Sequence, residues 1–147
     1  ERTLDQLRET EFTAFREGLY SDADLVMVGH AIMSCSGDDL PSDLSYTVVT
    51  EWLRGELGFN GVTVTDSHAM GAIVNNYDPG TAAVMAIQAG MDIVLMPNDF
   101  SSAYYAVLGA VQNGSISEAR IDESLERILS AKQRYGLLPS ENEEGVG

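Results

Sequence analysis

A short run of β-branched residues, placed between a glycine and an aspartate, constrains the fold of this chain more than any other feature. The run is Val62-Thr63-Val64-Thr65, with Gly58 before it and Asp66 directly after it. β-Branched residues favour a strand, and glycine readily takes the left-handed conformation that ends a helix. A carboxylate at the end of a buried strand is costly unless it has partners or a function. The pattern therefore predicts a helix that ends at Gly58, then a buried strand with a carboxylate at its carboxyl end.

Two further apolar runs, residues 24–30 and 92–97, also predict buried strands. The second run ends at Pro97, because proline has no N–H to donate to a neighbouring strand. The other segments show helical spacing of apolar residues. We expect helices over the opening residues, with Leu4, Leu7, Phe12 and Phe15 on one face, after the N-cap Ser45, over 81–89, over 101–112, and from Ser117 to Gly136.

The order strand, loop, helix therefore occurs three times after an initial helix. Alternation of this kind predicts an α/β fold with parallel strands and right-handed crossovers. Periodicity alone does not separate a segment of a (β/α) barrel from a small doubly wound sheet. The 147 residues are also few for a complete eight-stranded barrel, which takes about 250.

Three segments carry more specific patterns. They are Gly58-Phe59-x-Gly61-Val62-x-Val64-Thr65-Asp66-Ser67-x-x-Met70, Ala89-Gly90-x-Asp92-Ile93-Val94-Leu95-Met96-Pro97 and Gly114-x-Ile116-Ser117-x-x-Arg120-Ile121-Asp122-Glu123-Ser124-x-x-Arg127-Ile128-Leu129. Together they resemble glycoside hydrolase family 3, and within it the β-N-acetylhexosaminidase branch. Ser67 favours this branch, because the β-glucosidase branch usually has a tryptophan after the aspartate. His68 departs from the resemblance, since an aliphatic residue is usual there.

The resemblance implies a partial (β/α)8 TIM-type barrel of about three parallel βα units, which is half a barrel. Residues 1–138 are expected to be the C-terminal half of the family's barrel domain, and residues 139–147 a disordered acidic tail. The Lys-His-Phe-Pro-Gly-His-Gly segment of the other half does not occur in this sequence. Because open strand edges promote further pairing, we expect association with the missing N-terminal half of the barrel or with a second copy of the chain.

Asp66 is the principal candidate for catalysis. By resemblance it is the nucleophile that forms a glycosyl-enzyme intermediate, whereas its residue type alone favours an aspartate that caps the following turn. His30 follows the first strand run and matches a family histidine, which implies a side chain that lines the sugar pocket and contacts a sugar hydroxyl. The alternative for His30 is a hydrogen bond to a neighbouring strand end. The general acid/base is expected to be a histidine outside this sequence.

His68 and Met96 are the remaining substrate-binding candidates. Asp66-x-His68 repeats the Asp-x-His spacing of the family's acid/base dyad. That dyad lies on a mobile loop, however, whereas His68 follows a strand. We therefore expect His68 to be a surface or pocket-rim side chain. Met96 lies at the end of the third strand run, next to Pro97.

Asp92 stands at the start of the third strand run, so we expect it at the opposite face from Asp66 and in a structural role. The arginines on the predicted helices are expected to form ion pairs or to lie at the surface; they are Arg54, Arg120 and Arg127.

Charge and cysteine content exclude several other classes of protein. Asp and Glu number 23 against 8 Lys and Arg, a net charge of −15, which argues against nucleic acid as a partner. The single cysteine, Cys35, excludes an internal disulfide and a cysteine zinc cluster. The sequence lacks metal-ligand spacings and phosphate-binding loops, and it has no apolar run that approaches the roughly 20 residues of a membrane span. We therefore expect no metal, no organic cofactor and no membrane insertion.

The function that the resemblance implies is retaining hydrolysis of terminal β-linked N-acetylhexosamine, with a carbohydrate as the substrate partner. Two alternatives remain open. In the first, the isolated chain is a non-catalytic half-domain, and we expect it to be inactive on its own. In the second, the whole enzyme has β-glucosidase-like specificity.

Overall fold

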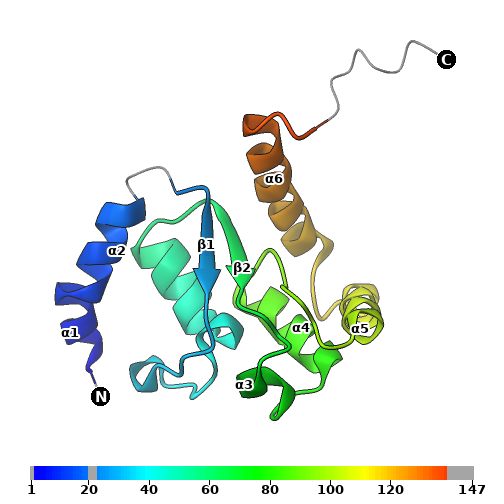
Figure 1. The fold of residues 1–147 in the computed structure, drawn as a ribbon, viewed down its shortest axis with the longest axis horizontal. Helices are drawn as coiled ribbons and strands as arrows, with labels where there is room; N and C mark the ends of the chain where they lie inside the picture. Colours follow the sequence, from blue (N-terminus) through cyan, green and yellow to red (C-terminus); the bar gives the residue numbers. More distant parts are fainter. Residues whose placement is uncertain (1, 20–22, 139–147) are drawn as a thin grey trace.

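Two short parallel strands form the centre of the molecule, with helices on both sides (Figure 1). The structure is a computed structural model in which residues 2–19 and 23–138 are described. Strand β1 (Leu25–Val28) pairs with β2 (Val62–Thr65), with Leu25 opposite Val62 and Val28 opposite Thr65. This register brings the carboxyl ends of the two strands to one edge of the sheet. The tail expected at residues 139–147 lies outside the described residues.

The helices follow the predicted order, with small differences in their limits. They are α1 (Leu4–Glu9), α2 (Glu11–Leu19), the short 3₁₀ turns η1 (Ser34–Ser36) and η2 (Ser42–Leu44), the π-helix η3 (Thr47–Glu56), α3 (Gly71–Val74), α4 (Pro79–Ala89), α5 (Phe100–Gln112) and α6 (Glu118–Arg134). The single opening helix that the sequence predicts is in fact two helices, separated at Thr10. The Thr10 hydroxyl donates to the carbonyl of Gln6, and such local bonds compete with the helical ladder.

Side-chain caps and glycines set the ends of these helices. Asp78, Asp99 and Ser117 each accept a backbone N–H at the start of α4, α5 and α6. The predicted N-cap Ser45 accepts the N–H of Val48 at 3.1 Å. Gly58 has a φ of +73°, which confirms the expected left-handed helix end.

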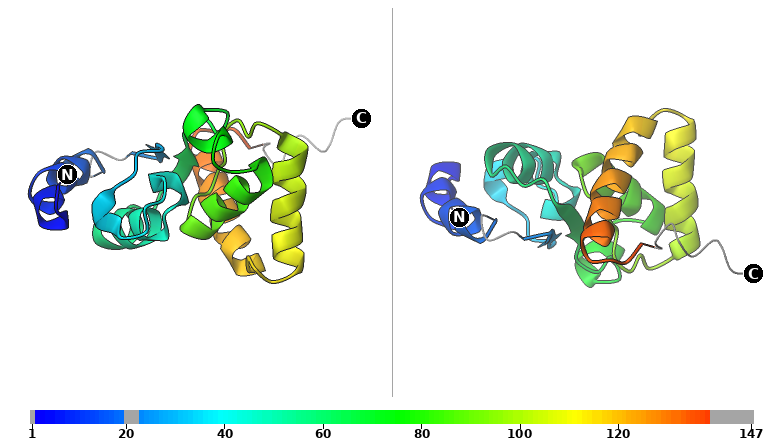
Figure 2. Two further views of the ribbon diagram at one scale, coloured as in Figure 1. Left: turned by 90° about the horizontal axis from the view of Figure 1, so that it is seen from below. Right: turned by 90° about the horizontal axis from the view of Figure 1, so that it is seen from above.

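The helix before β2 differs in form from the expected α-helix, because η3 carries wider i to i+5 bonds such as Leu57 N–H to Trp52 C=O at 2.8 Å. This helix nevertheless buries an apolar face. Val49, Trp52 and Leu53 are buried. Trp52 packs with Leu7 and Phe12 of the opening helices, and Val49 packs against the cluster under α4. Figure 2 shows α1 and α2 at one end of the molecule and α4 to α6 at the other, with the strands between them.

The third predicted strand, residues 92–97, lies beside β2 but makes a single parallel bridge, between Val64 and Ile93. Ile93 N–H bonds the carbonyl of Thr63, and Thr65 N–H bonds that of Ile93. The N–H of Leu95 then donates to the hydroxyl of Thr65 instead of a backbone carbonyl. The ladder therefore stops after one bridge, although the segment keeps the position expected of a third parallel strand.

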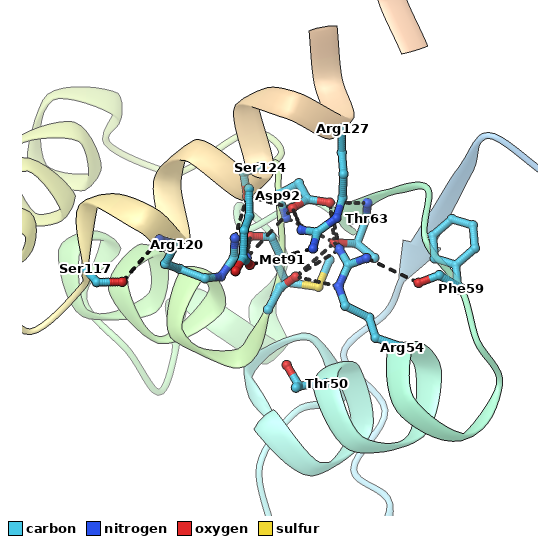
Figure 3. Close-up of polar contacts among 12 residues, drawn as sticks. Thr50, Arg54, Phe59, Thr63, Met91, Asp92, Ser117, Arg120, Ser124 and Arg127 are labelled. Atoms are coloured by element: carbon cyan, nitrogen blue, oxygen red, sulfur yellow. Dashed lines mark hydrogen bonds and ion pairs between the residues drawn. The ribbon is translucent and has the colours of Figure 1, made fainter. Parts of the chain in front are cut away.

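The amino-terminal end of the sheet is held by the buried carboxylate of Asp92 (Figure 3). Its Oδ2 accepts from Arg54 of η3 at 2.7 Å and from the Thr63 N–H at 3.0 Å. Its Oδ1 accepts from Ser124 at 2.6 Å and Arg127 at 2.9 Å, both on α6. Asp92 thus connects η3, β2 and α6, which confirms the structural role and the ion pairs expected from the sequence.

These contacts determine the ionisation of Asp92. Burial by itself disfavours the charged carboxylate, but the hydrogen bonds from Ser124 and the Thr63 N–H and the charges of Arg54 and Arg127 outweigh burial, so the pKa of Asp92 is lowered. The stability that this gives is present above the unfolded-state pKa. It is lost as the pH falls through the lower pKa of the folded state.

We predict that Asp92→Asn destabilises the protein by about 3 kcal/mol, because loss of one partner leaves the remaining charges of a buried ion cluster uncompensated. Chemical denaturation at neutral pH measures the change. The control is Glu123→Gln. Glu123 is 58% exposed and lies 3.7 Å from Arg127, so its loss should cost less than about 1 kcal/mol. Equal effects of the two substitutions would contradict the central place of Asp92.

The other side of β1 has no strand paired with it among the described residues. Leu25 and Met27 of this strand are 51% and 54% exposed. An unpaired strand with exposed apolar side chains promotes pairing with another chain. The expected association through this edge stays a prediction.

We predict that the 147-residue chain on its own self-associates at micromolar concentration, as measured by light scattering. Leu25→Lys together with Met27→Lys should reduce association, because edge lysines oppose strand pairing. Tyr104→Lys on α5, a position of similar exposure (54%) away from the sheet, is the matched control. A monomeric mass for the unsubstituted chain would contradict the prediction.

Candidate active site

Asp66 and His30 both lie at the carboxyl-terminal end of the sheet. Asp66 follows β2 directly, and its N–H donates to the carbonyl of Val28, the last residue of β1, at 2.9 Å. The half-buried side chain accepts the Ser67 N–H on Oδ1 at 2.7 Å. Among the described residues, its Oδ2 has no hydrogen-bond partner. The expected position of the carboxylate at the strand end is therefore confirmed, and one of its oxygens is available to a reactant.

His30 lies two residues beyond β1 and spans the gap to the β2 loop. Its Nδ1 lies 2.9 Å from Asp43 Oδ1, and its Nε2 lies 3.0 Å from the carbonyl of Ser67. Both partners accept and neither donates, so both ring nitrogens carry a proton and the ring is an imidazolium. The alternative interpretation of His30, a bond to a neighbouring strand end, matches this geometry.

The pKa of His30 agrees with the charged form. Burial disfavours the imidazolium, but the hydrogen bonds to Asp43 and to the Ser67 carbonyl outweigh that effect, with smaller attractions to Asp43 and Asp66, and the pKa is raised. The contacts therefore favour the positively charged form of His30, which is attracted to the carboxylate of Asp66.

The expectation of a surface or rim position for His68 is wrong. Its side chain is 2% exposed, and its Nε2 donates to Asp43 Oδ2 at 2.9 Å. Asp43 and not Asp66 is thus its carboxylate partner, which separates this pair from the Asp-x-His spacing in the sequence. His68 Nδ1 is buried without a hydrogen-bond partner in the described part of the chain.

Asp43 is the residue that sequence reasoning missed. It lies in the turn η2, and its side chain is fully buried between the two histidines. The sequence shows only an isolated aspartate after Pro41, with no spacing that relates it to His30 or His68. The contact depends on how the loop after β1 folds back, so no local pattern could have revealed it.

Met96 lies one residue after Leu95, whose carbonyl accepts the N–H of His68. Its side chain is 61% exposed and its φ is +47°, a conformation that is uncommon for a residue other than glycine. Its role in substrate binding stays a prediction.

Residues 2–19 and 23–138 meet neither the requirements of a metal site nor those of a membrane-spanning helix. These residues contain no group of three or more His, Cys, Asp or Glu that could hold a metal ion. None of their helices is long and apolar enough to cross a membrane.

Comparison with known proteins gives consistent matches. The profile of the glycosyl hydrolase family 3 N terminal domain matches residues 1–131. A β-N-acetylglucosaminidase of Paenibacillus sp. is 36% identical over 99% of this chain and 30% of its own, with a TM-score of 0.88.

Two curated relatives carry different names. The β-N-acetylglucosaminidase/β-glucosidase of Cellulomonas fimi is 28% identical over 90% of this chain. The periplasmic β-glucosidase of Salmonella typhimurium is 30% identical over 84%. The chain spans 26% and 16% of these two proteins, so it corresponds to a limited part of each.

We predict that His30 contributes a pH-dependent component to stability. Because its pKa is raised on folding, this component is fully present below the unfolded-state pKa of about 6.5. It is lost as the pH rises through the higher folded-state pKa. The difference in unfolding free energy between the wild type and His30→Gln should therefore shrink with rising pH in denaturant titrations. A difference independent of pH would contradict the imidazolium assignment.

Proposed function

The chain belongs to glycoside hydrolase family 3, and on this premise we propose that its Asp66 is the nucleophile of a retaining β-N-acetylhexosaminidase-like enzyme. The N-terminal domain of the family has a TIM-barrel-like fold, and the open parallel α/β structure described above is part of such a fold. The resemblance seen in the sequence is thereby confirmed at the level of the family and the fold.

The position of Asp66 directly after β2 is the main support for this proposal. Enzymes built on (β/α) barrels hold their catalytic groups at the carboxyl ends of the strands, and Asp66 directly follows β2 at that edge. One carboxylate oxygen is held by the Ser67 N–H at 2.7 Å. The other oxygen has no partner among the described residues, and this arrangement suits attack by a positioned carboxylate.

The proposed reaction has two steps. In the first, an Asp66 oxygen bonds to the anomeric carbon while the bond from that carbon to the leaving oxygen breaks, and the leaving oxygen takes a proton from the acid. In the second, water attacks the anomeric carbon, the bond to Asp66 breaks, and the base removes a proton from the water. We assign the acid/base to a residue outside this sequence, in keeping with the resemblance.

The structure also limits what His30 does in this reaction. Both of its ring nitrogens already donate to protein acceptors, Asp43 and the Ser67 carbonyl. This saturation argues against the direct contact with a sugar hydroxyl that the resemblance implies. We propose instead that His30 acts on the substrate only through the charge and order that it gives to the Asp66 loop.

For specificity we propose N-acetylhexosamine. Ser67 supports this choice, because the β-glucosidase branch usually carries tryptophan at that position. Relatives with hexosaminidase names and relatives with β-glucosidase names both match the chain, so glucoside specificity is the second candidate. Rates on aryl N-acetylglucosaminide and aryl glucoside, measured with the intact protein, separate the two.

We predict that an activated 5-fluoro N-acetylglucosaminyl fluoride leaves a covalent sugar on Asp66 of the intact protein. Fluorine beside the ring oxygen disfavours the oxocarbenium-like transition state, so hydrolysis of the intermediate is slow and the adduct accumulates. Intact mass and peptide mapping locate it. Asp66→Ala should lose the adduct and at least about 10³-fold in kcat, as losses of catalytic nucleophiles do.

Asp122→Ala is the control for this experiment, since Asp122 is an exposed carboxylate on α6. Its loss should change neither the amount of adduct nor kcat. An adduct on another residue would exclude Asp66 as the nucleophile. The isolated 147-residue chain should give no adduct, because it corresponds to only part of the related enzyme and so carries only part of the proposed sugar pocket; the fluoride leaving group itself needs little help from an acid.

A further inference from the structure

We propose that Asp43 and His68 are positioning residues, which fix the doubly donating ring of His30 against the main chain beside Asp66 and thereby orient the nucleophile. This inference rests on the proposed role of Asp66. It follows from a continuous chain of contacts that begins at the buried carboxylate of Asp43 and ends at the carboxylate of Asp66.

The first part of this chain is the buried carboxylate itself. Each Asp43 oxygen accepts from a different histidine, Oδ1 from His30 and Oδ2 from His68, both at 2.9 Å. The carboxylate is fully buried, and a buried negative charge is costly unless it is paired and hydrogen-bonded. The positive ring of His30 provides the pairing. The bond from His68 occupies the second oxygen and so prevents the carboxylate from rotating away.

The second part connects His30 to Asp66 through Ser67. The His30 Nε2 holds the Ser67 carbonyl at 3.0 Å, while the N–H of the same residue donates to Asp66 Oδ1 at 2.7 Å. A residue held at its carbonyl cannot turn freely, so its N–H keeps its direction toward the Asp66 carboxylate. Loss of the bond from His30 would therefore free the main chain of Ser67 and, with it, the carboxylate of Asp66.

A further contact holds the loop from the third strand segment. The backbone N–H of His68 donates to the carbonyl of Leu95 at 2.9 Å, while its ring reaches Asp43. The rings of His30 and His68 lie 5.8 Å apart between centroids. All of these contacts are formed within the described residues.

The positioning role makes a specific kinetic prediction. A misplaced nucleophile lowers the rate of the covalent step more than it weakens binding, and a displacement of about 1 Å costs about 10²-fold in rate. Asp43→Asn in the intact protein should therefore lower kcat by about 10²-fold, with KM little changed. Because it also removes the negative neighbour of His30, the alkaline limb of its pH–rate profile should move to lower pH.

A second pair of variants tests the same network without altering the buried carboxylate. His68→Gln keeps a donor for Asp43 Oδ2 and should retain most of the activity, whereas His68→Leu removes the donor and should resemble Asp43→Asn. Asp38→Asn is the matched control. Asp38 bonds Ser36, Ser45 and the Leu40 N–H and no histidine, so kcat and the pH profile should not change.

The rate at which Asp66 is labelled by the 5-fluoro sugar separates the two proposals. Labelling of Asp66 that is slower in Asp43→Asn and His68→Leu, and near normal in His68→Gln, supports the positioning role. Labelling of Asp66 at the wild-type rate in all variants, with superimposable pH profiles, overturns the positioning role and leaves the nucleophile assignment standing. Failure to label Asp66 in the wild type overturns both.

Discussion

The buried carboxylate of Asp92 is the interaction on which the rest of this structure depends. It accepts hydrogen bonds from Arg54 on η3, the Thr63 N–H on β2 and Arg127 on α6. Asp92 lies 29 to 38 residues from these partners in the sequence, and only 4 residues of each strand take part in the sheet. Packing of small apolar side chains alone would leave α6 free to shift along the sheet. The charged bonds to Asp92 fix its position (Figure 3).

A second fully buried carboxylate, Asp43, is paired in a different way. Asp92 has arginine partners, which stay charged at every physiological pH. Asp43 has histidines, one of which is an imidazolium because both of its partners are acceptors. The arginine cluster is therefore suited to permanent support, whereas the histidine cluster is sensitive to pH. The histidine cluster is also the one bonded to the loop that carries Asp66.

The sequence predicted the parts of this molecule that depend on local patterns. The strand before Asp66, the helix end at Gly58 and the start of the last helix at Ser117 follow from residue types at fixed spacing, and the structure confirms them. The third strand is shorter than predicted, because the N–H of Leu95 donates to the Thr65 hydroxyl and not to a backbone carbonyl. The periodicity of the sequence does not reveal this competition. The burial of His68 was missed for a similar reason, since Asp43 lies 25 residues away in the sequence and only the fold brings them together.

We propose that Asp66 attacks the sugar while the Asp43–His30–Ser67 contacts hold it in place. The most direct measurement is a crystal structure of the intact protein with the trapped fluorinated sugar. We expect a bond from an Asp66 oxygen to the anomeric carbon, with His30 still hydrogen-bonded to Asp43 and to the Ser67 carbonyl. A sugar attached to a different residue, or a His30 ring turned away from Ser67 to contact the sugar, would contradict it.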